Sequence, residues 1–330
     1  MPIFMKFLKA VCGAALCIAL QLIMASSGSA QNAASWPTRT VKFLLPLGAG
    51  SGVDIGARLL AQKLQDKWGV GVVVENKPGG DGLISVSAFL AAGDDHTLLF
   101  ASPGSFTVHP YQHEKLPYSF ERDLLPIAQF SNTIIAVAVS ANMGAASLKD
   151  LVARAKAEPG KFNSAVPAGI GELILDNFIK SEGLQTQKVP YRDIVQAAHD
   201  LAAGRLQIMM GSYAMLIPAT EGGQARILAV NSRERMPASP DIPTAIEAGF
   251  PSLELEGLVG LFGMRDMSAE LRERIGRDVV EVSRDPVMAE RLLRTGQVLN
   301  PGGAAEFQAS IKQQTDQVAA IAKFLGLKPK

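Results

Sequence analysis

The chain has 330 residues, of which 48% are hydrophobic and 19% are charged, and its formal net charge is +1. This composition is ample for a packed core and argues against a disordered chain. A charge so close to zero offers no electrostatic case for binding nucleic acid or a membrane surface. The length suits one large domain or two of ordinary size.

The first 30 residues have the pattern of a secretory signal peptide. Lys6 and Lys9 form a positive start, an apolar run extends from Ala10 to Ala25, and small or polar residues lead to Ala30. The alternative, a membrane anchor, would need about 20 apolar residues in a row. We therefore predict cleavage after Ala30 and a periplasmic location.

The residue types that carry catalysis or bind metals are scarce. Cys12 and Cys17 both lie inside the predicted leader, so the mature chain has no thiolate chemistry and no disulfide. His109 and His113 are separated by Pro110, which predicts a loop and argues against a helical metal-binding pair. The chain contains no HExxH, GxSxG or SxxK motif. We predict no enzymatic activity, no metal and no cofactor.

Strands and helices are predicted to alternate in the first part of the mature chain. Short apolar runs typical of buried strands lie at Val41–Leu47, Val70–Val74 and Thr97–Ala101. Apolar residues then recur at helical spacing over Ile55–Leu64, and a second helix is predicted over Leu83–Ala92. Repeated strand–helix steps indicate a parallel sheet with helices on both of its faces.

The alternation continues through the rest of the chain and favours a second α/β unit. Ser147 and Asp150 bound a capping-box pattern that opens a helix ending at Ala157. The other elements predicted in this part are strands at Ile134–Val139, Asn163–Val166, Val189, Ile208–Met210, Ile227–Val230 and Leu255–Phe262, and helices at Leu173–Ser181, Ile194–Ala203, Ser268–Arg284 and Ala304–Phe324. Spacing alone does not assign the C-terminal helices to either unit.

Glycine-rich loops after the strands are the candidate ligand sites, because ligands of open α/β sheets bind at the carboxyl ends of strands. In the first loop, small residues would let backbone N–H groups approach an anion closely. This loop comprises Leu47, Gly48, Ala49, Gly50 and Ser51. Val53 stands where a dinucleotide fingerprint requires glycine, which argues against NAD. A tight turn without a ligand is the alternative.

Further loops of this kind follow the second and third strands and open a later helix. Pro78–Gly82 is permissive in the same way, and the hydroxyls of Ser102–Ser105 either reach a ligand or cap a turn. Gly169, Gly171 and Glu172 open a helix in the second unit. Glu172 either stabilises the dipole of that helix or faces the cleft and accepts a hydrogen bond from the ligand.

Several segments, taken in order, carry a family resemblance. They are WPTRTVKFLLPLGAGSGVD, VVVENKPGGDG, LPYSFERDLLPIA, LKDLVARAKAEPGKF, KVPYRD, DLAAGRLQI and RILAVNSRERMPASPDIPTAIEAGFP. With these segments the chain from Trp36 to Leu327 resembles the tripartite tricarboxylate transporter receptors, which are the Bug-type solute-binding proteins. Each segment is modest alone, but their order and spacing together are highly specific.

The resemblance implies a two-lobed periplasmic-binding-protein fold of the Venus-flytrap, type II-like class, each lobe a mostly parallel sheet flanked by helices. Residues 31–133 with 257–330 would form lobe one, and residues 134–256 would form lobe two. It also implies capture of a small organic acid, a carboxylate or carboxylate-amide, in the cleft between the lobes. Nothing in the sequence suggests more than a monomer. The partner would be a membrane transporter of the tripartite type, which receives the ligand.

The same resemblance implies which residues bind the ligand. The loop from Leu47 to Asp54 would hold one end, largely through backbone amides and bridging waters. The helix start from Gly169 to Glu172, with the segments that contain Tyr191, Asp193 and Ser212, would hold the other end.

The chain departs from the family pattern in each of these segments. It reads PLGAGSG in place of PFPPGG, and GIGELIL in place of GxGSxxH, with Glu172 for the serine and Leu175 for the histidine. It also reads VPYRD in place of VPYKG, with Asp193 for the glycine. Carboxylates at these positions would repel a second carboxylate on the ligand. We therefore hypothesise that a monocarboxylate, or a ligand with an amine or amide, is preferred over a dicarboxylate.

Two other classes of function remain open at this point. A secreted enzyme on the same fold would need a paired acid and base in the cleft, and the sequence offers no clear pair. A subunit that reports its ligand to a membrane receptor kinase would display the same closed surface as a transport receptor, so the sequence alone does not separate these two.

Overall fold

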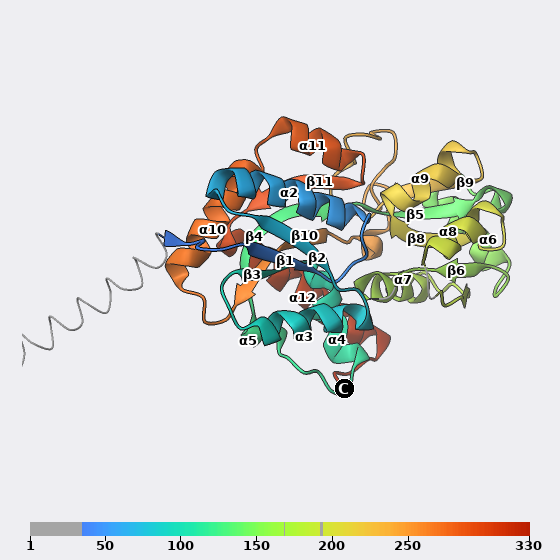
Figure 1. Cartoon of the computed structure of the whole chain (residues 1–330). Coiled ribbons are helices and arrows are strands. Elements are labelled where there is room, and N and C mark those ends of the chain that lie inside the picture. Colours follow the sequence, from blue (N-terminus) through green and yellow to red (C-terminus); the bar gives the residue numbers. More distant parts are fainter. Residues whose placement is uncertain (1–34, 168, 192–193) are drawn as a thin grey trace, which may run out of the picture.

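Two β-sheets, each covered by helices, form two lobes that lie side by side in the computed structural model (Figure 1). The structure describes residues 35–167, 169–191 and 194–330. The predicted leader and Asp193 lie outside the described residues. The expected α/β class and two-lobed architecture are confirmed, but both sheets are mixed and not mostly parallel.

The first sheet combines strands from both ends of the chain. Its strand order is β11-β4-β10-β3-β1-β2. The strands are β1 (Val41–Leu45), β2 (Val72–Asn76), β3 (Thr97–Ala101), β4 (Leu124–Thr133), β10 (Gly257–Met264) and β11 (Gln297–Gly302). β1 runs parallel to β2 and β3, whereas β10 is antiparallel to both β3 and β4. The chain leaves this sheet at the end of β4 and returns at the start of β10. These two strands therefore run in opposite directions.

Helices cover both faces of the first sheet, as strand–helix alternation predicts. They are α2 (Gly52–Trp68), η1 (Gly80–Gly82), α3 (Leu83–Ala92), α4 (Pro103–Gln112), α5 (Phe120–Asp123), α10 (Ala269–Val282), α11 (Pro286–Leu293) and α12 (Ala304–Leu325). Leu60 of α2 and Ile275 of α10 are fully buried on one face, and Phe89 of α3 and Phe307 of α12 on the other. The helix α4 corrects the prediction of a loop around Pro110, because this proline lies in the last turn.

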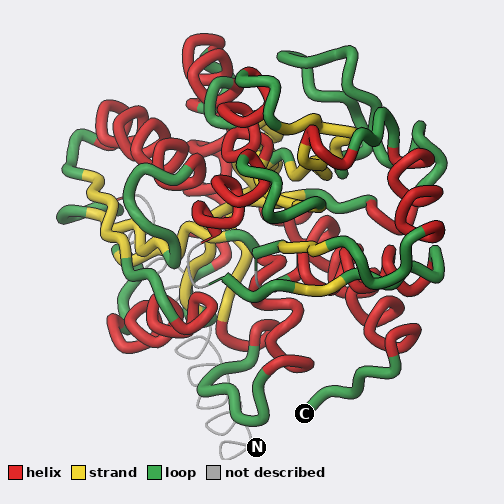
Figure 2. Tube along the Cα trace, turned by 90° about the vertical axis from the view of Figure 1, so that its right-hand side faces the viewer, coloured by secondary structure: helices red, strands yellow, loops and turns green. Residues whose placement is uncertain are grey.

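The second sheet contains only residues from the middle of the chain. Its strand order is β7-β6-β8-β5-β9, with β6 parallel to β7 and β8, and β5 antiparallel to β8 and β9. The strands are β5 (Ile135–Ser140), β6 (Asn163–Ala165), β7 (Gln187–Lys188), β8 (Ile208–Ser212) and β9 (Ala225–Val230). The helices are η2 (Ala141–Met143), α6 (Leu148–Ala157), α7 (Ile170–Ser181), α8 (Ile194–Ala202), α9 (Tyr213–Glu221) and η3 (Pro251–Leu253). Figure 2, which views the molecule from the side of this lobe, shows helices packed around strands.

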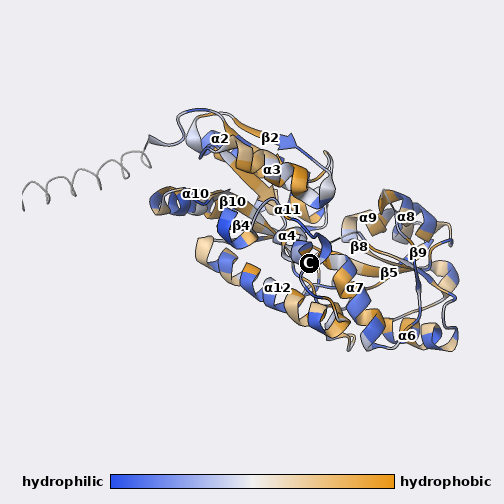
Figure 3. Ribbon diagram, turned by 90° about the horizontal axis from the view of Figure 1, so that it is seen from below, coloured by the Kyte–Doolittle hydropathy of each residue, from blue (hydrophilic) through white to orange (hydrophobic). Residues whose placement is uncertain are grey.

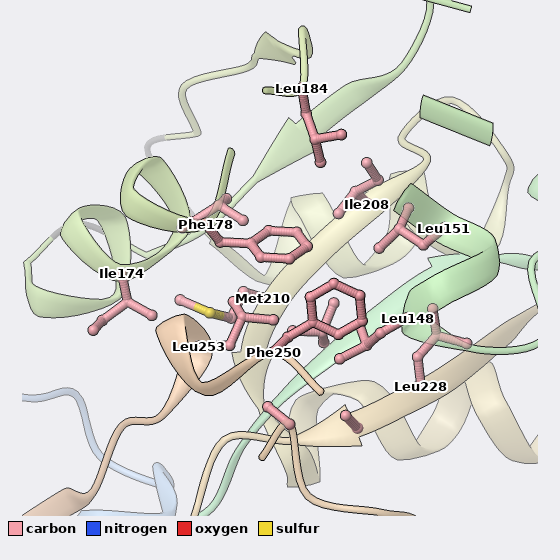
Figure 4. Packing of buried hydrophobic residues seen from close by; sticks show 14 of the residues in the cluster. Leu148, Leu151, Ile174, Phe178, Leu184, Ile208, Met210, Leu228, Phe250 and Leu253 are labelled. Carbon is pink, nitrogen blue, oxygen red and sulfur yellow. The ribbon is translucent and has the colours of Figure 1, made fainter. Parts of the chain in front are cut away.

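The start of α6 and the core beneath it agree with the sequence pattern. The hydroxyl of Ser147 accepts a hydrogen bond from the backbone N–H of Asp150 at 3.1 Å, which confirms the predicted cap. Beneath the helix, Phe178 and Phe250 meet edge to face with ring centroids 5.7 Å apart (Figure 4). Met210 lies in the same cluster and is fully buried, so β8 anchors the centre of lobe two.

The last helix, α12, contributes to the cores of both lobes. Phe307 and Ile311 in its first half join an apolar cluster of lobe one, and Val318 and Ile321 in its second half join a cluster of lobe two. Figure 3 shows polar and apolar residues alternating along this helix, as expected for one buried on a single face. The helix therefore ties the lobes together beside the crossings at Thr133–Ile135 and Leu255–Gly257. Of the helices described, none is long and apolar enough to cross a membrane.

Candidate functional site

A cavity of about 190 Å³ lies between the two lobes, where the strands of both sheets end. Its walls come from the segments that follow β1, β3 and β6, from the end of β8 and from both crossings between the lobes. The lining residues are Leu47, Val53, Ser102, Ser105, Thr133, Ile135, Val166, Pro167, Ile170, Gly171, Met210, Gly211, Leu255, Glu256 and Gly257. Ligands of open α/β sheets bind at this kind of position, so we take this cavity as the candidate site.

Two larger hollows fit this role less well. One of about 690 Å³ lies between α10 and the start of α12, and involves lobe one alone. The other, of about 360 Å³, is lined by Ile134, Glu256 and Leu258 at the crossings and by polar residues of α12. Ile134 and Leu258 alternate along the chain with residues that line the first cavity, so this hollow lies on the other side of the crossings, next to the segment that follows β9.

The loop before α2 is held by its own side chains. Asp54 is 2% exposed and accepts hydrogen bonds from the backbone of Gly50 at 2.9 Å, Arg58 at 3.1 Å and Asn76 at 2.9 Å. Burial raises the pKa of Asp54, but the hydrogen bonds from Arg58, Gly50 and Asn76 outweigh it, so that pKa lies below its ordinary value. Asn76 also donates to the carbonyl of Leu47 at 2.9 Å.

These bonds leave the loop only partly available to a ligand. Leu47 lines the cavity, whereas Gly48, Ala49, Gly50, Ser51 and Asp54 are not among its lining residues. The hydroxyl of Ser51 caps α2 by accepting from the backbone N–H of Asp54 at 3.2 Å. The predicted loop therefore meets the cavity through Leu47, and through Val53 of the first turn of α2.

The start of α4 presents two hydroxyls to the cavity. Ser102 is the N-cap residue of this helix, but its side chain makes no capping hydrogen bond. Ser105, one turn further, also lines the cavity, and no acidic residue lies in the first turn. A helix start without an internal anion favours a negatively charged ligand group, because its backbone N–H groups and dipole are directed at it.

At the start of α7 the backbone borders the cavity but the carboxylate does not. Gly171 lines the cavity, and Gly169 is the N-cap residue with φ at 104°. Glu172 is not among the lining residues; its carboxylate accepts from the ammonium of Lys188 at 2.8 Å, which also pairs with Asp176 at 2.9 Å. Burial lowers the pKa of Lys188, but the bonds to Glu172 and Asp176 raise it above its ordinary value.

Tyr191 and Ser212, which were also predicted to hold the ligand, do not line the cavity. The hydroxyl of Tyr191 donates to Asp200 of α8 at 2.9 Å. Ser212 is the N-cap residue of α9 and makes no side-chain cap, and its neighbour Gly211 lines the cavity. The structure thus brings together Leu47, Ser102 and Gly171 of the predicted set.

Ser105, whose hydroxyl the sequence offered as a possible ligand contact, lines the cavity. Sequence reasoning did not single out several other residues that the structure places in or against the site. Thr133 adds a hydroxyl, and Ile170 and Met210 add apolar surface. Asn76 fixes the loop before α2. A signal for Asn76 existed, because it ends a strand next to a glycine-rich loop, but only the fold shows that this strand lies beside β1.

His109, the first of the paired histidines, is held in the core. His109 is fully buried, with Nδ1 2.8 Å from the hydroxyl of Tyr118 and Nε2 3.1 Å from the carbonyl of Asp81. Burial lowers the pKa of His109, which favours the neutral ring. Within the described residues, no group of three or more His, Cys, Asp or Glu side chains is placed to hold a metal ion.

Comparisons with known proteins find a matching family and several similar proteins. A family model described as the tripartite tricarboxylate transporter family receptor matches residues 56–327. A UPF0065 protein of Bordetella bronchiseptica is 28% identical over 309 residues, which cover 93% of this chain and 92% of that protein. BugT of Bordetella pertussis is 26% identical over 281 residues, which cover 83% of this chain and 86% of that protein.

Two solved structures are also similar to this chain. The structure of R. palustris Rpa4515 with adipate has a TM-score of 0.79 and 25% identity, and the match covers 89% of this chain and 100% of that one. The periplasmic binding protein BugD has a TM-score of 0.75 and 25% identity, with the same coverage of both chains.

Proposed function

Because the chain belongs to the tripartite tricarboxylate transporter receptor family, we propose that it captures a small organic acid in the cavity between its lobes and delivers it to a membrane transporter of the tripartite type. The family is one of solute receptors, and we propose no catalytic role for this member. Related solved structures are a periplasmic transporter and the periplasmic binding protein BugD, which implies a periplasmic location. We further propose export through the leader at residues 1–30 and action as a monomer.

The observation that carries this proposal is the position and lining of the cavity. It lies between the lobes at the strand ends, and it is lined by Ser102, the N-cap residue of α4, whose hydroxyl makes no capping bond. A carboxylate there would accept charge-assisted hydrogen bonds, which strengthen when closure of the lobes excludes water. The adipate in the R. palustris protein, which shares this fold, supports an acid as the ligand.

The lobes also offer a simple route from binding to delivery. A ligand that contacts both walls would hold the lobes together through motion at Thr133–Ile135 and Leu255–Gly257. A transporter that recognises the closed arrangement would then bind the loaded receptor in preference to the empty one.

A thermal-shift screen against organic acids tests capture, and two matched variants test its location. A ligand at about 100 times its Kd should add about 2.7 kcal/mol of stability. We expect Ser105→Phe, which fills the cavity between the lobes, to abolish the shift. Ser310→Phe fills the hollow behind the crossings and should leave the shift intact. The reverse pattern would overturn the assigned site, and a folded protein that binds no acid would overturn the proposed function.

A further inference from the structure

The lobe-two wall of the cavity is apolar. Val166 follows β6, Ile170 begins α7, and Met210 lies in β8, and all three line the cavity. Ile135 and Leu255 continue the same surface across the crossings. Met210 also belongs to the buried cluster of lobe two in Figure 4, so this wall is backed by a packed core and has little freedom to rearrange.

The polar groups gather on the opposite wall. Ser102 and Ser105 lie at the start of α4, and Thr133 lies at the adjacent crossing. The start of α2, also on this wall, is already occupied by the carboxylate of Asp54. The start of α4 therefore suits a ligand carboxylate, because no acidic side chain of its first turn competes there.

The described lining residues include no cation that could pair with a second ligand carboxylate. Among the lining residues that the structure describes, Glu256 is the one charged residue. Its carboxylate accepts from Asn132 at 2.6 Å and from the backbone N–H of Arg233 at 3.1 Å, both of which line the hollow behind the crossings. A second ligand carboxylate would face the apolar wall without a cationic partner, which opposes its burial.

The size of the cavity limits the rest of the ligand. Its volume is about 190 Å³, somewhat larger than the roughly 150 Å³ apolar cavity that accepts benzene. An apolar body of about six carbons is therefore of suitable size.

We propose that the solute is a monocarboxylate with an apolar body of about six carbons, its carboxylate at the start of α4 and its body against Val166, Ile170 and Met210. This inference rests on the proposed function, and it specifies the class of acid. It agrees with the preference hypothesised from Glu172, but for a different reason, since the carboxylate of Glu172 is bound to Lys188 and does not line the cavity.

Calorimetry with hexanoate, adipate and hexanamide tests the proposal, because these ligands keep the carbon chain and change only its ends. We expect hexanoate to bind at least about ten-fold more tightly than either of the others. Adipate binding as tightly as hexanoate, or more tightly, would overturn the proposal and leave the capture of acids intact. If the folded protein binds none of these three ligands and no other organic acid, the proposed function itself is overturned.

A variant of the apolar wall provides a second, independent readout. Val166→Arg places a cation where the far end of the ligand would lie, and should shift the affinity ratio toward adipate by about ten-fold. Val166→Leu keeps the wall apolar and should preserve the ratio of the natural protein. An unchanged ratio in folded Val166→Arg would show that the far end of the ligand does not meet this wall.

Discussion

Helices α2 and α7 begin on opposite sides of one cavity, and each carries a carboxylate in its first turn. Asp54 of α2 is 2% exposed and accepts from a backbone amide and two side chains. Glu172 of α7 has 37% of its side chain exposed and pairs with Lys188. The same kind of residue at the same helical position is thus a buried anchor of a loop in one lobe and a surface ion pair in the other.

The neighbouring strand accounts for the difference. Asn76 at the end of β2 donates both to Asp54 and to the loop before it, so the carboxylate is drawn inward. Lys188 at the end of β7 lies near the surface and draws Glu172 outward. A first-turn acid therefore identifies a helix start, but the partner on the adjacent strand decides whether it shapes the site.

The largest effect is expected from Asp54→Ala. The change leaves the donors of Gly50 and Asn76 without their acceptor, and we expect a loss of about 2–3 kcal/mol in the free energy of unfolding. Urea unfolding would show this as a lower midpoint at unchanged slope. As a control, Arg58→Ala removes a half-exposed partner and should cost less than about 1 kcal/mol. Equal losses for both variants would contradict the anchoring role of Asp54.

The start of α4, the third helix at the cavity, lies close to the start of α7 in the other lobe. A Cβ atom at Gly104 would lie 2.9 Å from Cγ2 of Ile170 in the other lobe. Gly104→Ala should therefore weaken ligand binding by about ten-fold, because overpacking costs about 1–3 kcal/mol when the lobes close. Folding should survive, because alanine favours a helix by about 1 kcal/mol over glycine.

Gly71→Ala provides the matched control for this effect. Its Cβ atom would meet only Thr40, at 3.4 Å, far from the cavity. We expect no change in ligand affinity for this variant by calorimetry. An unchanged affinity in Gly104→Ala would show that the contact between α4 and α7 is not part of the ligand-bound state.

The dependence of stability on pH should report the charge of Asp54 with a smaller effect. The pKa of Asp54 is lower in the folded chain than its ordinary value of 3.8, so its stabilising contribution is complete above that value. The contribution is lost as the pH falls from about 4 through the folded pKa. The stability gap between the natural protein and Asp54→Asn should therefore be widest near neutral pH and should narrow in acid. A gap independent of pH would contradict the role of the charge.

Much of the fold followed from local pattern. The helix predicted over Leu83–Ala92 and the strand predicted over Thr97–Ala101 match α3 and β3 in both bounds. The strands β4 and β11 were missed, because their pairing with distant segments stabilises them and no alternating pattern marks them. The mixed direction of the sheets depends on the same long-range crossings, which periodicity does not encode.

The candidate site was predicted less completely than the fold. Loops after strands pointed to Leu47, Ser102 and Gly171, since strand ends meet at one edge in this architecture. The apolar wall was missed because Met210 and Val166 look like ordinary core residues in the sequence, and only packing leaves one side of each facing the cavity. The partners of Asp54 and Glu172 were also beyond local reasoning, since Asn76 and Lys188 approach them through tertiary structure.

The smallest effect is expected from Glu172→Gln, and this variant separates the two explanations for a monocarboxylate preference. Because the ion pair with Lys188 is partly exposed and Asp176 still holds that lysine, the free energy of unfolding should change by less than about 0.5 kcal/mol. Calorimetry should also find the ratio of hexanoate to adipate affinity within about two-fold of the natural protein. A gain of about ten-fold in adipate affinity would instead show that Glu172 repels the second carboxylate across the cleft. In that case the acid on α7, and not the apolar wall behind it, would set the specificity of the receptor.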